Sequence, residues 1–291
     1  MRVLLATDGS NDAKGAVEWL HHLPLPGDRD VMVITVVMPP LIPAVPDLVG
    51  ELHGALIADA RRLADDTASE LLCRTAIGRV VEGDPREAIV AAAREWGADL
   101  IVLGARGLGA IKEFLLGSVS LWVARHAPCP VLVCKGTPRT VRAITVGLDG
   151  SDHARRALDW LASLPLAPET RVRLIASAEP QHYPSSAPGI LREALRTAVS
   201  TVDAERRAAL EAALRDCART LGGGATVALE VVSGAPAAEL VRDAQRHGSD
   251  LVVVGARGAG AVTRLLLGSV SESVLRHADC PVLVVRARDE G

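Results

Sequence analysis

Glycine residues recur at a fixed spacing in two segments of the chain, GARGLGAIKEFLLGS at 104–118 and GARGAGAVTRLLLGS at 255–269. In each segment a second glycine follows the first after three residues, and a Gly-Ser pair begins ten residues beyond it. Because glycine has no Cβ, its backbone N–H groups can approach an anion closely. A helix that starts at the Gly-Ser pair would add N–H groups without internal partners, which favour a phosphate. The spacing therefore predicts a phosphate pocket between a glycine loop and a helix start.

The same glycines could be ordinary turn residues that follow strands, with Ser118 serving only as a helix N-cap. Two familiar phosphate-binding fingerprints do not match. No Gly-Lys-Ser or Gly-Lys-Thr occurs, so there is no Walker A loop, and Gly104, Gly107 and Gly109 follow the order GxxGxG rather than GxGxxG. A phosphate pocket here would be of a different kind.

The two segments belong to a longer internal duplication, in which residues 98–134 and 249–285 are identical at 24 of 37 positions. The chain of 291 residues exceeds one typical domain, which also favours two. We expect domains at 1–137 and 141–291, joined by a short polar linker. The offset between the copies grows from 141 to 151, so the second domain has gained about ten residues.

Composition favours a cytoplasmic protein. No apolar run reaches the length of a membrane span, and the N-terminus meets Asp8 too early for the apolar region of a signal peptide. The five cysteines contain no CxxC pair and are typical of reduced thiols. Net charge is −3 and the chain has only four Trp, one Tyr and one Phe, so we expect no nucleic-acid partner.

Each half alternates strand and helix patterns, which predicts a parallel, doubly wound α/β sheet with right-handed crossovers. The strands expected in the first half are 2–7, 31–37, 75–81, 99–104 and 130–134. The helices expected there are one capped by Ser10, one at 51–72, one from Pro85 to about Trp96, and one at 118–126. The second half repeats the pattern.

The polar and glycine-rich residues follow the first and fourth strands of each half. In open α/β sheets, ligands bind beyond the carboxyl ends of the strands, where the strand order reverses. If these two strands are neighbours at that point, Asp8-Gly9-Ser10 and residues 104–107 line one cleft.

With these motifs, ATDGS and GLDGS at the strand ends and Gly-x2-Gly-x9-Gly-Ser in each half, the chain resembles the tandem-domain, ATP-binding branch of the universal stress protein family. The resemblance covers essentially the whole chain. It implies Rossmann-like domains, each a five-stranded parallel sheet of order 3-2-1-4-5 with helices on both faces. It also implies ATP or another adenine nucleotide in the cleft, with Mg²⁺.

By position, the resemblance implies that Asp8 and Asp149 lie near the ribose or the metal-bound phosphates. The residues that it implies around the phosphates are Gly104, Gly107, Gly117, Ser118 and Val119 in the first half and Gly255, Gly258, Gly268, Ser269 and Val270 in the second.

The resemblance also implies that backbone groups hold the adenine edge. They belong to Val36 or Val37 in the first half, and to Ser177 or Ala178 in the second. The second half differs from the first at this adenine wall, where VITVVMPP is replaced by LIASAEPQ. This difference bears on the nucleotide affinity of the second half.

Several other residues leave alternatives open. Arg106 and Arg257 could reach a phosphate or remain solvated in a loop. Lys112 aligns with Thr263 in the other copy, and this difference argues against a catalytic lysine. The segments 38–50 and 179–193 could each be a lid over the nucleotide or a stiff surface loop.

His126 and His277 end helices, where a cation is favourable without any catalytic role. Cys129 and Cys280 precede the last strands, where we expect inert buried thiols rather than redox switches.

The implied strand order places the two apolar fifth strands at sheet edges, which a protein normally pairs or covers. The family commonly pairs domains through this strand, so we expect the two halves to join there about a pseudo-twofold axis. The outer helical faces could still support a homodimer.

Together these features predict a cytoplasmic stress protein that senses or stores ATP with little or no turnover. A slow ATPase and an interaction module with non-functional clefts are the alternatives.

Overall fold

The computed structural model describes residues 1–39, 46–108, 116–178, 189–221, 225–258 and 267–286. In the first domain the strands are β1 (Arg2–Ala6), β2 (Asp30–Val37), β3 (Thr75–Glu82), β4 (Leu100–Gly104) and β5 (Val131–Cys134). Its helices are α1 (Asn11–His22), α2 (Pro46–Ser69), α3 (Pro85–Trp96) and α4 (Ser118–His126).

The second domain repeats these elements in the same order. Its strands are β6 (Ala143–Leu148), β7 (Arg171–Ala178), β8 (Thr226–Ser233), β9 (Leu251–Gly255) and β10 (Val282–Val285). Its helices are α5 (Asp152–Ala162), α6 (Gly189–Thr220), α7 (Pro236–His247) and α8 (Ser269–His277).

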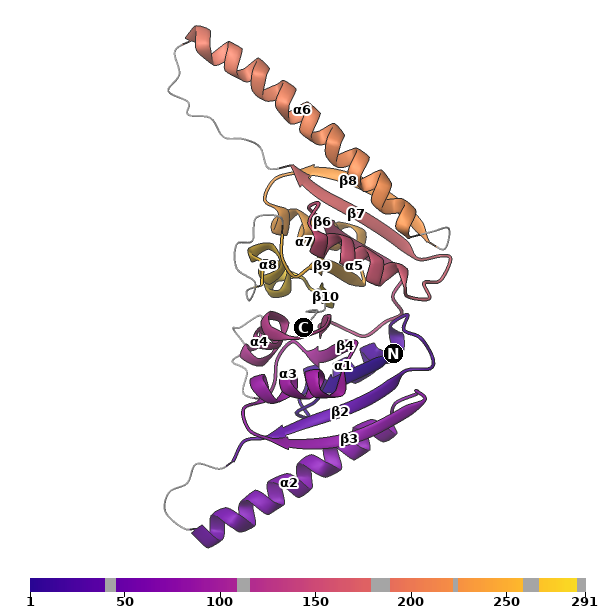
Figure 1. Ribbon diagram of the computed structural model, residues 1–291, viewed down its shortest axis with the longest axis vertical. Helices are drawn as coiled ribbons and strands as arrows, with labels where there is room; N and C mark the ends of the chain where they lie inside the picture. The colour runs from indigo at the N-terminus through magenta and orange to yellow at the C-terminus, as the bar shows by residue number, and fades with distance from the viewer. Residues whose placement is uncertain (40–45, 109–115, 179–188, 222–224, 259–266, 287–291) are drawn as a thin grey trace.

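All ten strands form one sheet of order β3-β2-β1-β4-β5-β10-β9-β6-β7-β8 (Figure 1). Each domain therefore contributes a parallel sheet of order 3-2-1-4-5, which confirms the expected fold class. The strand order reverses between β1 and β4, and between β6 and β9. The loops after these strands consequently lie side by side at the carboxyl edge of the sheet.

The two domains meet where β5 pairs with β10, the one antiparallel contact between described strands. Leu132 lies opposite Leu283 at the centre of this short pairing. It joins two strands that would otherwise be exposed apolar edges, and thereby continues the sheet from one domain into the other.

Alternate residues of the buried strands face opposite sides of the sheet, as period-two strand geometry requires. Val3 and Leu5 of β1 pack with helices α1, α2, α5 and α6 in one apolar cluster. Leu4 and Ala6 pack on the other side, with α3, α4, α7 and α8. Helices cover both sides, which explains why these strands are continuously apolar.

Two helix starts agree with their sequence signals. The Ser10 hydroxyl accepts a hydrogen bond from the Ala13 N–H at 3.2 Å and caps α1. Pro85 occupies the first turn of α3, which ends at Gly97 in the left-handed conformation with φ of 67°.

The long helices differ from expectation. The helix expected at 51–72 runs from Pro46 to Ser69, because a proline is tolerated in a first helical turn, where its missing N–H has no acceptor. In the second domain, α6 begins at Gly189, inside the segment expected as a loop. At 32 residues it is longer than the 24-residue α2, so helix α6 takes up much of the insertion.

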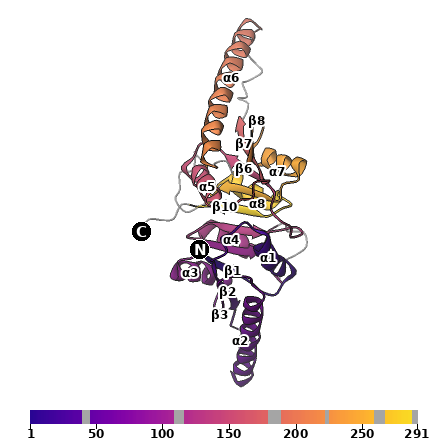
Figure 2. The same ribbon diagram turned by 90° about the vertical axis from the view of Figure 1, so that its right-hand side faces the viewer.

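Both long helices project beyond the sheet at its opposite ends, as Figures 1 and 2 show. Residues 40–45 and 179–188 of the segments expected as lids or surface loops lie outside the described residues. Among the described helices, none combines the length and apolar composition needed to cross a membrane.

Candidate functional site

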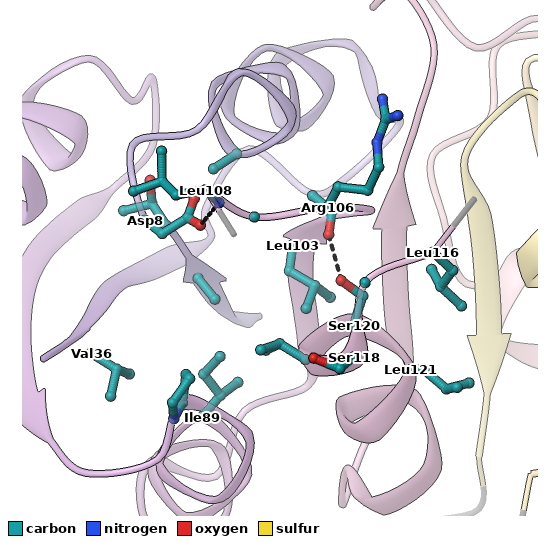
Figure 3. Close-up of a pocket in the computed structure, with 18 of the residues that line it drawn as sticks. Asp8, Val36, Ile89, Leu103, Arg106, Leu108, Leu116, Ser118, Ser120 and Leu121 are labelled. Carbon is teal, nitrogen blue, oxygen red and sulfur yellow. Dashed lines mark hydrogen bonds between the residues drawn. The ribbon is translucent and has the colours of Figure 1, made fainter. Parts of the chain in front are cut away.

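A cavity of about 710 Å³ opens at the carboxyl ends of β1 and β4 in the first domain (Figure 3). Its size is within the usual range for small-molecule sites. It is lined by the loops after these two strands, by the end of β2, and by the starts of α3 and α4.

Asp8 ties the two loops together. One carboxylate oxygen accepts the Ser10 N–H at 3.0 Å, and the other accepts the Leu108 N–H at 2.9 Å, a contact visible in Figure 3. Gly9, with φ of 78°, makes the turn after Asp8 possible. A Cβ on Gly107 would lie 2.5 Å from the Asp8 carboxylate, so Gly107 leaves the space that this carboxylate occupies.

Gly104 allows the end of β4 to approach α1. A Cβ there would lie 2.5 Å from the backbone carbon of Asp12, and a Cβ on Gly255 would lie 2.7 Å from that of His153. None of the described glycines in the repeated motif has a positive φ. Close approach of backbones, rather than unusual backbone angles, thus accounts for glycine at these two positions.

Helix α4 starts at the cavity wall without a side-chain cap at its N-cap, Gly117. The Gly117 N–H itself donates to the Ala105 carbonyl at 2.8 Å, so it does not point into the cavity as a free donor. The following N–H groups, of Ser118 and Val119, have no acceptor within the helix, and both residues line the cavity. This helix start can receive an anion.

The opposite end of the cavity is apolar. Val36, Ile89 and Leu103 line it, and Figure 3 places Val36 and Ile89 together on this side. Val37 does not line the cavity, and its carbonyl accepts the Gly83 N–H at 3.0 Å. Of the two adjacent valines, Val36 is therefore the one positioned to contact a ligand.

The Arg106 guanidinium is held by Asp12, with Nε 3.0 Å from a carboxylate oxygen. In Figure 3 this side chain points away from Ser118 and Val36. Its backbone carbonyl accepts a hydrogen bond from the Ser10 hydroxyl at 3.3 Å. In this arrangement Arg106 braces the loop after β4 against α1.

Sequence reasoning predicted the cap at Ser10 but missed two further serine contacts. The Ser10 hydroxyl also donates to the Arg106 carbonyl, and the buried Ser120 hydroxyl donates to the Gly104 carbonyl at 2.8 Å. In the second domain, Ser271 makes the same contact with Gly255 at 2.6 Å. The available signal was the Ser-Val-Ser sequence that opens both helices.

The second domain has a corresponding cavity of about 400 Å³. Asp149 accepts the Ser151 N–H at 3.0 Å, and a Cβ on Gly258 would lie 2.6 Å from the Asp149 carboxylate. Gly268 donates its N–H to Ala256 at 2.8 Å, as Gly117 does in the first domain. Ser269 and Val270, which open α8, line this cavity.

Two residues in and beside the second cavity differ from their counterparts in the first domain. Ser177 replaces Val36 on its wall, whereas Ala178 does not line it, and the Ser177 hydroxyl donates to the Gly234 carbonyl at 2.6 Å. His153 replaces Asp12 beside Arg257. Burial and the nearby Arg257 charge lower the pKa of His153, which makes the neutral imidazole more favourable.

Other candidate residues have structural partners. Nδ1 of His126 donates to the Trp122 carbonyl at 2.8 Å, and Nδ1 of His277 to the Ser273 carbonyl at 2.7 Å. All five cysteines are free thiols, and burial raises the pKa of Cys280 to about 11. Within the described part of the chain, no three His, Cys, Asp or Glu residues gather as metal ligands. Lys112 lies outside the described residues.

The universal stress protein family model matches residues 1–135 and again 140–286. The chain belongs to the universal stress protein family. Universal stress protein Rv2005c of Mycobacterium tuberculosis is 30% identical to it, over 98% of this chain and 96% of that protein. The match extends over both domains, so this universal stress protein shares the tandem organisation of its mycobacterial relative.

Solved structures support the same fold. A universal stress protein from Archaeoglobus fulgidus superimposes with a TM-score of 0.66 at 22% identity, covering 100% of this chain and 97% of its own. A putative universal stress protein from Pseudomonas aeruginosa gives a TM-score of 0.60 at 17% identity, with coverages of 99% and 94%. At these identities the likeness concerns the fold.

Proposed function

We propose that this universal stress protein binds an adenine nucleotide, ATP with Mg²⁺, in the first-domain cavity and in its smaller counterpart. The observation that carries the proposal is that the two ends of the first cavity differ in chemical character, one being apolar and the other offering backbone N–H groups. An apolar end at Val36 and Ile89 suits a base, and the uncapped start of α4 suits phosphates. Asp8, an exposed residue of the cavity lining, suits the ribose or a phosphate-bound Mg²⁺.

The geometry around Asp8 is compatible with a metal that the nucleotide brings with it. Each carboxylate oxygen accepts one backbone N–H and retains further acceptor capacity. Since Mg²⁺ usually binds through one or two carboxylates together with substrate phosphates, a single aspartate is sufficient. In this proposal the protein positions the metal and the polyphosphate supplies most of its ligands.

The cavity favours binding over rapid turnover. Among its described lining residues Asp8 is the single carboxylate, and in this proposal its remaining acceptor capacity is taken up by the ribose or by the phosphate-bound Mg²⁺. A general base for an attacking water needs a free acceptor within hydrogen-bond reach of that water. We therefore propose a cytoplasmic protein that senses or stores ATP in a stress response, and that could assemble as a homodimer through its outer helices.

The nucleotide content of freshly purified protein tests this function. Protein is heat-denatured and the supernatant is chromatographed for adenine nucleotides, followed by calorimetric titration of nucleotide-free protein with ATP and Mg²⁺. Bound or titratable ATP supports the proposal, and the absence of both favours an interaction module. A multiple-turnover phosphate-release assay then separates a binder from an enzyme, because turnover near 1 s⁻¹ or faster is typical of ordinary enzymes.

A further inference from the structure

The first cavity extends past the start of α4 to the boundary between the domains. Leu116 and Leu121 line this end, and the second domain adds the side chain of Arg276 from α8. In Figure 3, Leu116 and Leu121 lie on the side of the cavity nearest the yellow strands of the second domain, with Val36 on the opposite side and Ser118 between.

Glu272 holds Arg276 at this boundary. One of its carboxylate oxygens accepts a hydrogen bond from Arg276 at 2.8 Å, and the other accepts one from Arg125 of α4 at 2.6 Å. Burial alone would raise the pKa of Glu272, but the hydrogen bonds from the two arginines outweigh it and lower that pKa. The carboxylate thus stays ionised and fixes both guanidinium groups.

The duplication shows that this arrangement is one-sided. In the repeat, Arg125 occupies the position of Arg276, whereas Leu121 occupies the position of Glu272. Among the described residues that line the second cavity, the charged ones are Asp149 and Arg257, and Arg125 is not included. Glu272 therefore has no acidic counterpart in the first domain. Among the described lining residues, an arginine from the other domain, Arg276, is present at the first cavity and has no counterpart at the second.

We propose that Arg276 is a ligand-binding residue of the first-domain site and that it contacts the terminal phosphates of the bound nucleotide. The inference rests on the proposed function. With the base at the Val36 end and the proximal phosphates at the start of α4, the distal phosphates extend toward Leu121 and Arg276. A guanidinium has five donors, so Arg276 can hold Glu272 and still offer N–H groups to a phosphate.

A consequence is selectivity by phosphate number at the first site. A triphosphate reaches Arg276, whereas a monophosphate ends at the start of α4. The second site lacks the corresponding arginine among its described lining and distinguishes the two nucleotides less. The second domain thereby contributes directly to what the first domain binds.

The test is calorimetric titration of full-length wild type, Arg276→Gln and Arg276→Lys with Mg²⁺-ATP and with AMP. We expect Arg276→Gln to weaken ATP binding at the first site about tenfold, the effect of losing one charge-assisted hydrogen bond, and to change AMP binding less than twofold. Arg276→Lys should retain part of the ATP affinity. Hydrogen exchange at residues 116–121 and 267–272 assigns each binding event to its domain.

Arg125→Gln is the matched control. Arg125 also donates a hydrogen bond to Glu272, but it does not line the first cavity. This variant should leave both nucleotide affinities within twofold of wild type. Unchanged ATP affinity in folded Arg276→Gln, or equal weakening of ATP and AMP, overturns the role of Arg276 while nucleotide binding stands. Wild type that binds neither nucleotide overturns the proposed function and this inference together.

Discussion

Lys135 and Arg286 occupy equivalent positions in the two repeats. Each donates hydrogen bonds across the domain boundary to carbonyl groups near the C-terminal end of a helix in the other domain. Lys135 donates to the carbonyl of Ala278 at 3.1 Å and to that of Leu275, at the end of α8. Arg286 donates to the carbonyl of Ala124 at 3.3 Å, near the end of α4. Cations are favourable at helix C-termini, so these reciprocal contacts reinforce the pairing of β5 with β10.

The Lys135 contact should make stability depend on pH. Burial lowers the pKa of Lys135 to about 8 from its ordinary 10.5. Between these values the unfolded chain binds the proton more tightly than the folded protein, so wild-type stability should rise with pH in this window. Relative to Lys135→Met, the gain should be at most about 3 kcal/mol.

Urea unfolding of both proteins at pH 7.5, 9 and 10.5 measures this effect. Groups other than Lys135 titrate in both proteins and cancel in the difference. A difference in unfolding free energy that stays constant across the three pH values would show that the Lys135 pKa is not lowered by folding.

Proline in either of the two strands that pair at the domain boundary should separate the two halves. Ile101 donates its N–H to the Pro130 carbonyl at 2.9 Å, and strand alternation then directs the Val131 N–H away from β4 and toward β10. Val131→Pro removes a donor from the β5–β10 pairing, and Val282→Pro is the matched change in the other strand.

Each proline variant should show two unfolding transitions by calorimetry, or faster proteolysis within residues 135–140. If both variants unfold in one transition with the protease resistance of wild type, the pairing contributes nothing to holding the domains together.

Gly117 and Gly268 should be required for nucleotide binding. A Cβ on Gly117 would lie 3.1 Å from the Ala105 carbonyl oxygen, tighter than ordinary contact, so a larger side chain must displace the start of α4. We expect Gly117→Val combined with Gly268→Val to abolish ATP binding with little change in circular dichroism.

Gly15→Val is the control, because no atom outside its own helix lies within 4 Å of a Cβ there, and this variant should bind ATP as wild type does. ATP affinity that persists in the folded double variant is incompatible with phosphates at the starts of α4 and α8.

Asp8 and Asp149 should each support ATP binding in their own domain. Asp8→Ala removes the carboxylate that joins the two loops of the first cavity, and Asp149→Ala removes its counterpart. We expect each change to weaken ATP binding about tenfold in its own domain, the effect of losing a hydrogen-bonded charged group. Calorimetry with and without Mg²⁺ isolates the metal contribution, and equal wild-type affinities under the two conditions would exclude it.

Much of the fold follows from local sequence. The continuous apolar strands, the cap at Ser10 and the proline at the start of α3 each depend on residues close in the chain, where propensity is decisive. The position of the glycines after the first and fourth strands, together with the strand order implied by the family resemblance, placed both candidate sites at the carboxyl edge. The predicted start of α2 at residue 51 was wrong, because proline is compatible with both a loop and a first helical turn and the helix begins at Pro46.

The contacts that shape the site required the tertiary structure. Glycine spacing alone could not show that Gly104 makes room for α1 or that Gly107 makes room for Asp8, because those neighbours are nearly a hundred residues away. The same holds for Asp12, which holds Arg106, and for Arg276, which reaches the first cavity from the other domain. Sequence determined which residues could bind a phosphate, and long-range packing decided which of their groups face the cavity, since side-chain partners depend on proximity in space.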